Sequence, residues 1–89
     1  MERELTILNK LGLHARPAAE FVRCARKFKA TVVIRKDGEE YSAESILDVL
    51  SANLDCGSRM LLSADGPDAA IALQEIAALL DQFRVQEDE

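Results

Sequence analysis

The segment GLHARPAAEF, residues 12–21, contains the single histidine of the chain. Arg16 follows His14 by two residues, and Pro17 comes directly after the arginine. An uncharged imidazole nitrogen is a nucleophile near neutral pH, and a planar guanidinium can hold two phosphoryl oxygens at once. This pattern predicts a histidine that accepts a phosphoryl group, with Arg16 beside it to stabilise the group.

The residues around His14 also predict the start of a helix. Gly12 lets the incoming chain turn without a steric penalty. Pro17 has a fixed φ and no N–H, so it suits a first helical turn and places His14 at or just before the N-cap. Unpaired backbone N–H groups and the positive end of the helix dipole would then lie beside the imidazole. Such a helix end suits a phosphate and favours the uncharged ring.

Each of these residues also has a purely structural interpretation. A lone histidine at a helix start can be a capping or surface residue, and Arg16 can be a solvated charge. The sequence has no Walker-type glycine-rich loop, no paired carboxylates that would place Mg²⁺ and no second histidine. We therefore expect no metal and no cofactor. The pattern favours a carrier that passes a phosphoryl group between partners over a free-standing enzyme.

Hydrophobic periodicity predicts the elements that must position this site. Strands are expected at residues 4–8, 30–36, 58–64 and, after the Asp-Gly hairpin signal KDGEE, in EEYSA. Helices are expected from residue 17 to about 28, across 42–53 and across 65–83. The order βαββαβα predicts an α+β fold, in which a four-stranded sheet carries helices on one face.

The two later helices carry more detailed predictions. The short helix begins near Ser42 or Ala43 and has Ile46, Val49 and Leu50 on one side. In the long helix, Pro67 is expected in the first turn, with aspartates at the N-terminal end. Its buried stripe is expected to consist of Ile71, Ala72, Leu73, Ile76, Leu79, Leu80 and Phe83.

The composition is that of one small globular domain over residues 1–89. Hydrophobic residues make up 48% of the chain and charged residues 30%, which is ordinary for such a domain. No apolar run reaches membrane-spanning length, and the N-terminus lacks a signal-peptide core, so we expect a cytoplasmic protein with no membrane segment. Cys24 and Cys56 form no metal-type cluster and are expected to be buried, reduced thiols.

Charge is distributed unevenly along the chain. Residues 1–36 contain nine Lys/Arg and three Asp/Glu, a balance of +6, whereas residues 37–89 contain two and thirteen, a balance of −11. The net charge of −5 and the four aromatic residues make nucleic acid a poor partner. A basic surface near His14 fits an acidic protein or a phosphate, although any one of these cations can be a solvated helix residue. The basic residues are Arg16, Arg23, Arg26, Lys27 and Lys29.

The motif GLHARPAAEFVRCARKF resembles the active-site segment of the HPr family. These are the histidine-containing phosphocarrier proteins of the bacterial phosphoenolpyruvate-dependent phosphotransferase system. The resemblance extends over nearly the whole chain and includes SAESILDVLSANLDCGSRMLLSADGPDAAIAL. It implies an open-faced β-sandwich, in which three helices cover one face of a four-stranded antiparallel sheet.

The resemblance also implies a role for each residue of the motif. His14 would be phosphorylated on Nδ1 by enzyme I, with phosphoenolpyruvate as the source. Arg16 would brace the phosphoryl group, and the backbone amides of Ala15 and Arg16 would complete its cradle. The group would then pass to IIA proteins that serve sugar transport or regulation. The carrier is expected to be a monomer.

A docking surface for enzyme I and the IIA proteins is implied beside the motif. It would combine Leu47 and Leu50 of the short helix with Arg23 and Lys27 of the first helix. The alternative for the two leucines is a place in the hydrophobic core.

Ser45 resembles the regulatory serine that an HPr kinase phosphorylates in some bacteria. A phosphate there would add negative charge beside the docking surface and repel acidic partners. Glu44 and Asp48 depart from the pattern of that site, where Lys and Gly are common, which argues against such regulation. The structural alternative for Ser45 is a helix N-cap.

The same residues are also compatible with other functions. Within the family, the nitrogen-related branch NPr passes its phosphate to a regulatory IIA protein. Both NKLGLHARPA and the acidic surface of the short helix suit that branch. A non-catalytic adaptor that binds a kinase or transcription regulator would use the same basic surface, and would only need to bind, whereas a carrier must relay its phosphate. An independent hydrolase is disfavoured, because the sequence offers no partner nucleophile or metal ligands.

Overall fold

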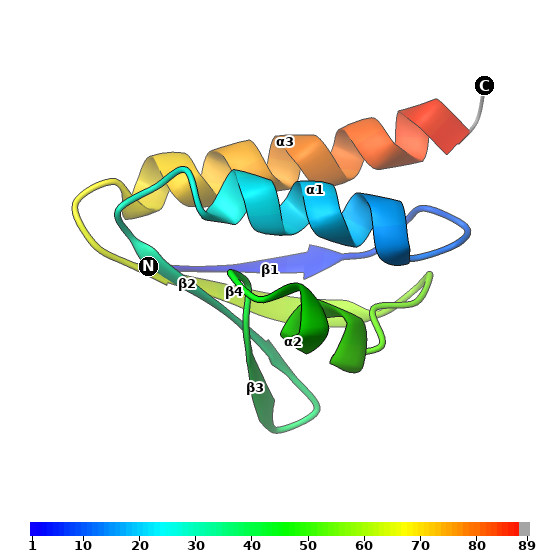
Figure 1. Ribbon diagram of the computed structural model, residues 1–89, viewed down its shortest axis with the longest axis horizontal. Helices are drawn as coiled ribbons and strands as arrows, with labels where there is room; N and C mark the ends of the chain where they lie inside the picture. The colour runs from blue at the N-terminus through cyan, green and yellow to red at the C-terminus, as the bar shows by residue number, and fades with distance from the viewer. Residues whose placement is uncertain (88–89) are drawn as a thin grey trace.

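Strands and helices follow one another in the predicted order βαββαβα (Figure 1). The computed structural model describes residues 1–87. The strands are β1 (Glu2–Thr6), β2 (Thr31–Lys36), β3 (Glu39–Ser42) and β4 (Arg59–Asp65). The helices are α1 (Ala15–Ala25), α2 (Ile46–Ser51) and α3 (Ala69–Glu87). None of the helices within these residues is long and apolar enough to cross a membrane.

The four strands form one antiparallel sheet in the order β1-β4-β2-β3. Strand β4 lies inside the sheet, where Leu62 is paired with Ile34 of β2 on one side and with Arg3 of β1 on the other. Helices α1 and α3 lie side by side across one face, and the short α2 packs against α1 and β3 (Figure 1). The predicted α+β fold class is confirmed.

The core lies between the sheet and the helices. Alternate residues of the inner strands are buried, among them Val32 and Ile34 of β2 and Leu62 of β4. Phe21 of α1 and Ile76 of α3 cover them, and both are fully buried. Each such side chain contributes roughly 1.5–3 kcal/mol through burial, so this single layer supplies most of the driving force for folding.

The hairpin between β2 and β3 forms as the Asp-Gly signal predicts. Asp37 and Gly38 both have positive φ, of 53° and 80°, and Lys36 is paired with Glu39 across the turn. These are the dihedral signs of a tight two-residue hairpin turn. The Lys36 ammonium donates hydrogen bonds to the carbonyls of Ala52 and Asn53, at 2.9 and 2.8 Å, and so fixes the C-terminal end of α2.

Several predicted boundaries differ from the structure. Strand β1 ends at Thr6, so Ile7 and Leu8 lie in the loop that follows it. Helix α2 starts at Ile46, with Ser45 as its N-cap, later than predicted. Pro67 lies before the first turn of α3, which begins at Ala69. In each case the pattern identified the element and missed its ends by a few residues.

The predicted buried stripe of α3 is wrong at Ile71, which is 56% exposed. The helix faces the core through residues at helical spacing, and Ile71 lies on its opposite side. The buried members are Ala69, Ala72, Leu73, Ile76, Leu80 and Phe83, with Leu79 partly buried. The thiol prediction is wrong at Cys56, which is exposed on the loop between α2 and β4, whereas Cys24 is buried.

The Asp68 carboxylate joins the start of α3 to the loop that follows α1. It accepts hydrogen bonds from the backbone amides of Lys29 and Ala30, at 2.9 and 2.8 Å. The bond from the Lys29 amide is the main reason why the pKa of Asp68 is lowered, and the Ala30 amide adds to the effect. Because these donors favour the ionised form, the carboxylate stabilises this corner of the fold more when it is charged than when it is protonated.

Asp68→Asn should therefore lower stability at neutral pH and change its pH dependence. A carboxyl whose pKa is lower in the folded protein contributes stability that is present above its unfolded pKa and lost as the pH falls through the folded pKa. The difference between wild type and variant should thus shrink under acidic conditions. Thermal unfolding over a pH series measures this difference. Asp65→Asn, at an exposed position on β4, is the control, and a difference that is constant with pH would contradict the assignment.

Candidate functional site

His14 is the N-cap residue of α1, where the sequence places it. Its backbone is extended, with φ −86° and ψ −170°, and its carbonyl accepts a hydrogen bond from the Ala18 amide at 2.8 Å. The imidazole makes no capping hydrogen bond to the helix and is exposed to solvent. The backbone of His14 therefore performs the capping role, while the side chain remains accessible for chemistry.

The mouth of α1 offers backbone donors beside this ring. The amides of Ala15 and Arg16 lie in the first helical turn, where no preceding carbonyl of the helix can accept them. Pro17 has no N–H, and the Ala18 amide already donates to His14. The first turn has no acidic residue, and the Arg16 side chain is exposed. The amides and the helix dipole thus make the N-terminal end of α1 suited to an anion, and Arg16 belongs to the same helical turn.

The imidazole is oriented by the loop in front of the helix. Its Nδ1 lies 3.3 Å from the carbonyl oxygen of Gly12. A carbonyl oxygen only accepts hydrogen bonds, so this contact is a hydrogen bond when Nδ1 carries a proton. The same oxygen accepts a hydrogen bond of 2.6 Å from the Asn9 side-chain amide. Asn9 is buried, and no motif in the sequence marks it as part of the site.

The loop that carries Gly12 is held against the segment after α2. Gly12 has φ +67°, and a Cβ on it would lie 2.5 Å from the carbonyl oxygen of Leu54. The next residue, Leu13, donates its amide to that same oxygen at 2.8 Å. Glycine is therefore required at position 12 both by its dihedral angles and by the close approach of the two backbones.

The four predicted docking residues are all exposed. Leu47 is 72% exposed and Leu50 39% exposed, so neither belongs to the core. Ile46, which was expected to pack on one side of α2, is also exposed at 40%. Arg23 and Lys27 are exposed on α1, and a groove between α1 and α2 is lined by Ala19, Val22, Arg23, Arg26, Lys27 and Ile46.

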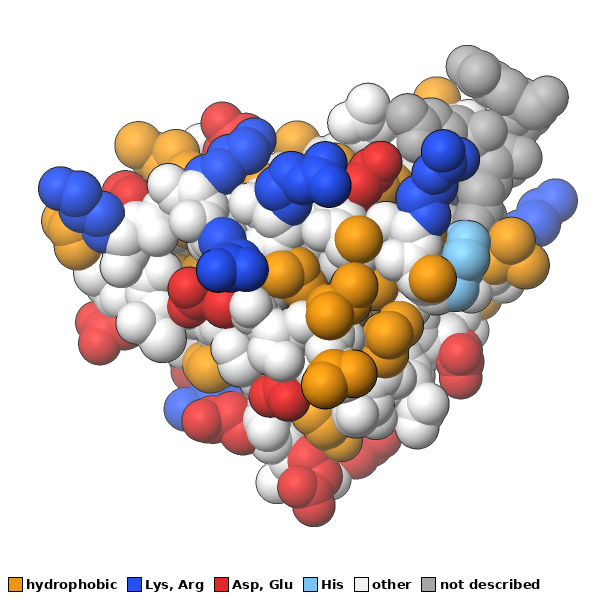
Figure 2. All heavy atoms as spheres, in the orientation of Figure 1, with side chains coloured by type: hydrophobic (Ala, Val, Ile, Leu, Met, Phe, Trp, Pro, Cys, Tyr) orange, Lys and Arg blue, Asp and Glu red, His pale blue; other side chains and the backbone are white. Residues whose placement is uncertain are grey.

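Figure 2 shows how these groups are distributed over the surface. Lys and Arg side chains form a row over α1, and the histidine lies near one end of the row. Hydrophobic side chains gather next to them, over α2. We call the exposed Ile46, Leu47 and Leu50 together the apolar patch. Exposed apolar groups rimmed by charges are typical of a protein-binding surface.

Ser45 has the structural role of a helix N-cap, which was the alternative to a regulatory site. It is the N-cap of α2, and its hydroxyl oxygen accepts a hydrogen bond of 3.4 Å from the Asp48 amide. The Asp48 carboxylate in turn accepts a hydrogen bond from the Ser42 amide at 2.9 Å. A negative charge is therefore already fixed in the first turn of this short helix.

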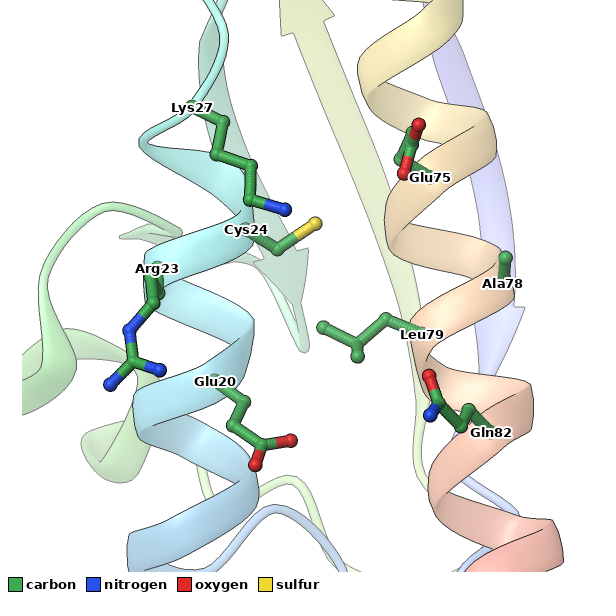
Figure 3. Close-up of a pocket in the computed structure, with 8 residues that line it drawn as sticks. All are labelled: Glu20, Arg23, Cys24, Lys27, Glu75, Ala78, Leu79 and Gln82. Atoms are coloured by element: carbon green, nitrogen blue, oxygen red, sulfur yellow. The ribbon is translucent and has the colours of Figure 1, made fainter.

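A second groove lies between α1 and α3, on the other side of Arg23 and Lys27 (Figure 3). The Cys24 side chain points into it from α1, opposite Leu79 of α3. Burial raises the pKa of the Cys24 thiol, and the nearby Lys27 cation opposes the shift without reversing it. The thiol is therefore protonated at neutral pH and a poor nucleophile. Within residues 1–87, no group of three His, Cys, Asp or Glu side chains is placed to hold a metal ion.

The fold and the site define a class of protein: a small α+β domain with an open antiparallel sheet and one exposed histidine at the N-terminus of a helix. The family model for the HPr component phosphorylation site of the phosphotransferase system matches residues 1–82. The chain belongs to the HPr family of phosphocarrier proteins.

Relatives from two branches of this family resemble the chain to a similar degree. Phosphocarrier protein HPr from Vibrio cholerae is 37% identical over 82 residues, which are 92% of this chain and 96% of the relative. Phosphocarrier protein NPr from Shewanella violacea is 41% identical over 81 residues, which are 91% of this chain and 89% of the relative. Overall identity therefore does not separate the two branches.

Solved HPr structures share the fold. The crystal structure of HPr from Thermoanaerobacter tengcongensis has a TM-score of 0.85 at 38% identity, over 100% of this chain and 97% of that chain. HPr from this organism has also been solved as a dimer, with a TM-score of 0.75. A monomeric state thus stays a prediction for the present chain.

Gly12→Ala should lower the free energy of unfolding by more than the usual cost of placing an alanine at positive φ. An alanine at positive φ costs about 1–2 kcal/mol, and at this position its Cβ would also push the Leu54 backbone away. Gly38→Ala is the matched control, since Gly38 also has positive φ but open space around it. Denaturant unfolding measures both free energies, and equal losses would show that the contact with Leu54 contributes nothing.

Proposed function

We propose that this protein carries a phosphoryl group on His14 between enzyme I and IIA proteins. Phosphoenolpyruvate would be the ultimate source, and the protein would act in the cytoplasm as a monomer without a cofactor. The observation that carries the proposal is the exposed imidazole at the N-terminus of α1, beside two backbone amides and Arg16, in a chain of the HPr family.

The transfer needs positioning and charge compensation more than covalent help from the protein. The lone pair of an uncharged imidazole nitrogen attacks phosphorus, a nitrogen–phosphorus bond forms, and the bond to the donor breaks with its electrons going to the donor. The amides of Ala15 and Arg16 and the Arg16 guanidinium offset the charge on the phosphoryl oxygens. Reversal of these steps onto a nucleophile of the acceptor completes the relay. Phosphorylation on Nδ1 requires the ring to leave the Gly12 carbonyl, which occupies that side of the nitrogen.

Enzyme I and the IIA proteins would dock on the apolar patch and the adjoining cations. Leu47 and Leu50 supply exposed apolar area, and Arg23 and Lys27 flank it from α1. An acidic partner surface would be attracted to this side of the protein although its net charge is negative.

Ser45 is a secondary candidate, as a substrate of an HPr kinase. A phosphate on its hydroxyl would replace the N-cap hydrogen bond and lie beside the Asp48 carboxylate and the apolar patch. Like-charge repulsion from Asp48 opposes this modification, and the phosphate would weaken docking of acidic partners.

A second candidate function is the nitrogen-related relay, in which the phosphate passes to a regulatory IIA protein. The chain resembles an NPr, at 41% identity, about as closely as it resembles an HPr, at 37% identity, so both relays are candidates. Transfer to purified IIA proteins of each type distinguishes the two candidates. Binding to a kinase or transcription regulator without any relay would instead indicate an adaptor.

Incubation with enzyme I and phosphoenolpyruvate should add one phosphoryl group, stable in alkali and lost in acid, as expected for a phosphohistidine. Because the chain has a single histidine, His14→Ala should abolish the adduct. Intact-mass spectrometry at high pH measures the adduct, and circular dichroism checks that the variant is folded. Labelling that survives in a folded His14→Ala protein would refute the proposed function.

Arg16→Ala should slow phosphoryl transfer by about 10-fold or more, because it removes one charged donor from the phosphoryl oxygens. Stability should change by no more than about 0.5 kcal/mol, since the Arg16 side chain is exposed. Arg59→Ala makes the same change of charge at an exposed position of β4 and should leave the rate unchanged. Rapid-quench kinetics and denaturant unfolding measure the two effects. A large loss of stability in Arg16→Ala would instead indicate a structural arginine.

A further inference from the structure

Asn9 lies five residues before His14, in the loop that follows β1, and only 2% of its surface is exposed. Its side-chain amide donates to the Gly12 carbonyl at 2.6 Å, and the Gly12 amide donates to the Asn9 carbonyl at 3.1 Å. These two bonds close residues 9–12 into a tight turn. A buried amide is costly unless it is hydrogen-bonded, so this turn is strongly favoured over alternatives that break the bonds.

The turn directs the Gly12 carbonyl oxygen toward the imidazole of His14. The Gly12 oxygen has two lone pairs, and the structure places the Asn9 amide and His14 Nδ1 around it, at 2.6 and 3.3 Å. A glycine peptide can otherwise rotate with little steric resistance. Asn9 on one side and the Leu54 backbone on the other hold this peptide in place.

We propose that Asn9 is a positioning residue for His14, and that it acts through the Gly12 carbonyl. With the oxygen held toward the ring, the uncharged imidazole keeps its proton on Nδ1, and the lone pair of Nε2 faces away from the loop. The hydrogen bond made by one ring nitrogen sets the tautomer of the whole ring. The role of Asn9 in phosphoryl transfer rests on the proposed function of His14.

The arrangement defines a resting and a loaded position of the ring. Before Nδ1 can form a bond to phosphorus, its proton must pass to solvent while Nε2 takes one up, and the ring must turn away from Gly12. The carbonyl then keeps the Asn9 amide as a hydrogen-bond donor. Asn9 therefore orients the resting ring and also limits the cost of releasing it.

The tautomer of His14 can be measured without any partner protein. The chain has one histidine, so ¹⁵N NMR of the ring, at a pH where the imidazole is uncharged, reports the ratio of the Nδ1–H and Nε2–H forms. Wild type should be mostly Nδ1–H. Asn9→Asp removes the donor at nearly constant volume and should lower the ratio about five-fold, the factor that corresponds to a net hydrogen bond of about 1 kcal/mol. Asn9→Ala should shift it in the same direction and serves if the aspartate variant fails to fold.

Asp68→Asn is the control, because it removes one of the two acceptor oxygens that bind the backbone beyond the other end of α1. It should leave the tautomer ratio unchanged even where stability falls. A mostly Nε2–H ring in wild type, or a ratio that does not move in either Asn9 variant, would overturn the assignment to Asn9. Failure of enzyme I to label His14 would overturn the proposed function and leave the tautomer result standing, so the two failures are distinguishable.

Discussion

The close approach of two backbones, at Gly12 and Leu54, is the contact on which the site depends. The Leu13 amide binds the Leu54 carbonyl at 2.8 Å, and the loops continue in register, with Ile7 and Gly57 bonded at 2.7 Å. This contact fixes the start of α1 relative to the segment that follows α2. His14 and the apolar patch are therefore held in fixed positions relative to each other. In the proposed relay, a partner docked on the patch would meet the imidazole in a defined position.

The fold gathers the basic residues of the sequence on one part of the surface. The basic residues of the first part of the chain form a row along α1, and His14 lies near one end of that row (Figure 2). Charges farther apart than about 8 Å are largely screened at physiological ionic strength, so a partner responds to this row and not to the net charge of the molecule. The acidic remainder disfavours non-specific binding to nucleic acid without weakening the local attraction.

Local patterns in the sequence predicted the parts of the structure that have local causes. Pro17 and Gly12 located the helix start, and the Asp-Gly pair located the hairpin, because each restricts the backbone at its own position. The pattern failed at Ile71, since periodicity identifies a helix but not how much of its circumference the neighbours cover. Asn9 was missed for a related reason. Its importance comes from a carbonyl whose direction depends on Leu54, and no spacing near residue 9 contains that information.

A carrier must hold its phosphoryl group firmly enough to keep it and loosely enough to give it away. The groups at the mouth of α1 are two amides and one exposed guanidinium, and water weakens each of their interactions with an anion. A partner bound to the apolar patch would exclude that water and strengthen the same interactions during phosphoryl transfer. In the proposed relay, the exposure of His14 would keep the charge stabilisation weak while no partner is bound, and the docked partner would supply the rest.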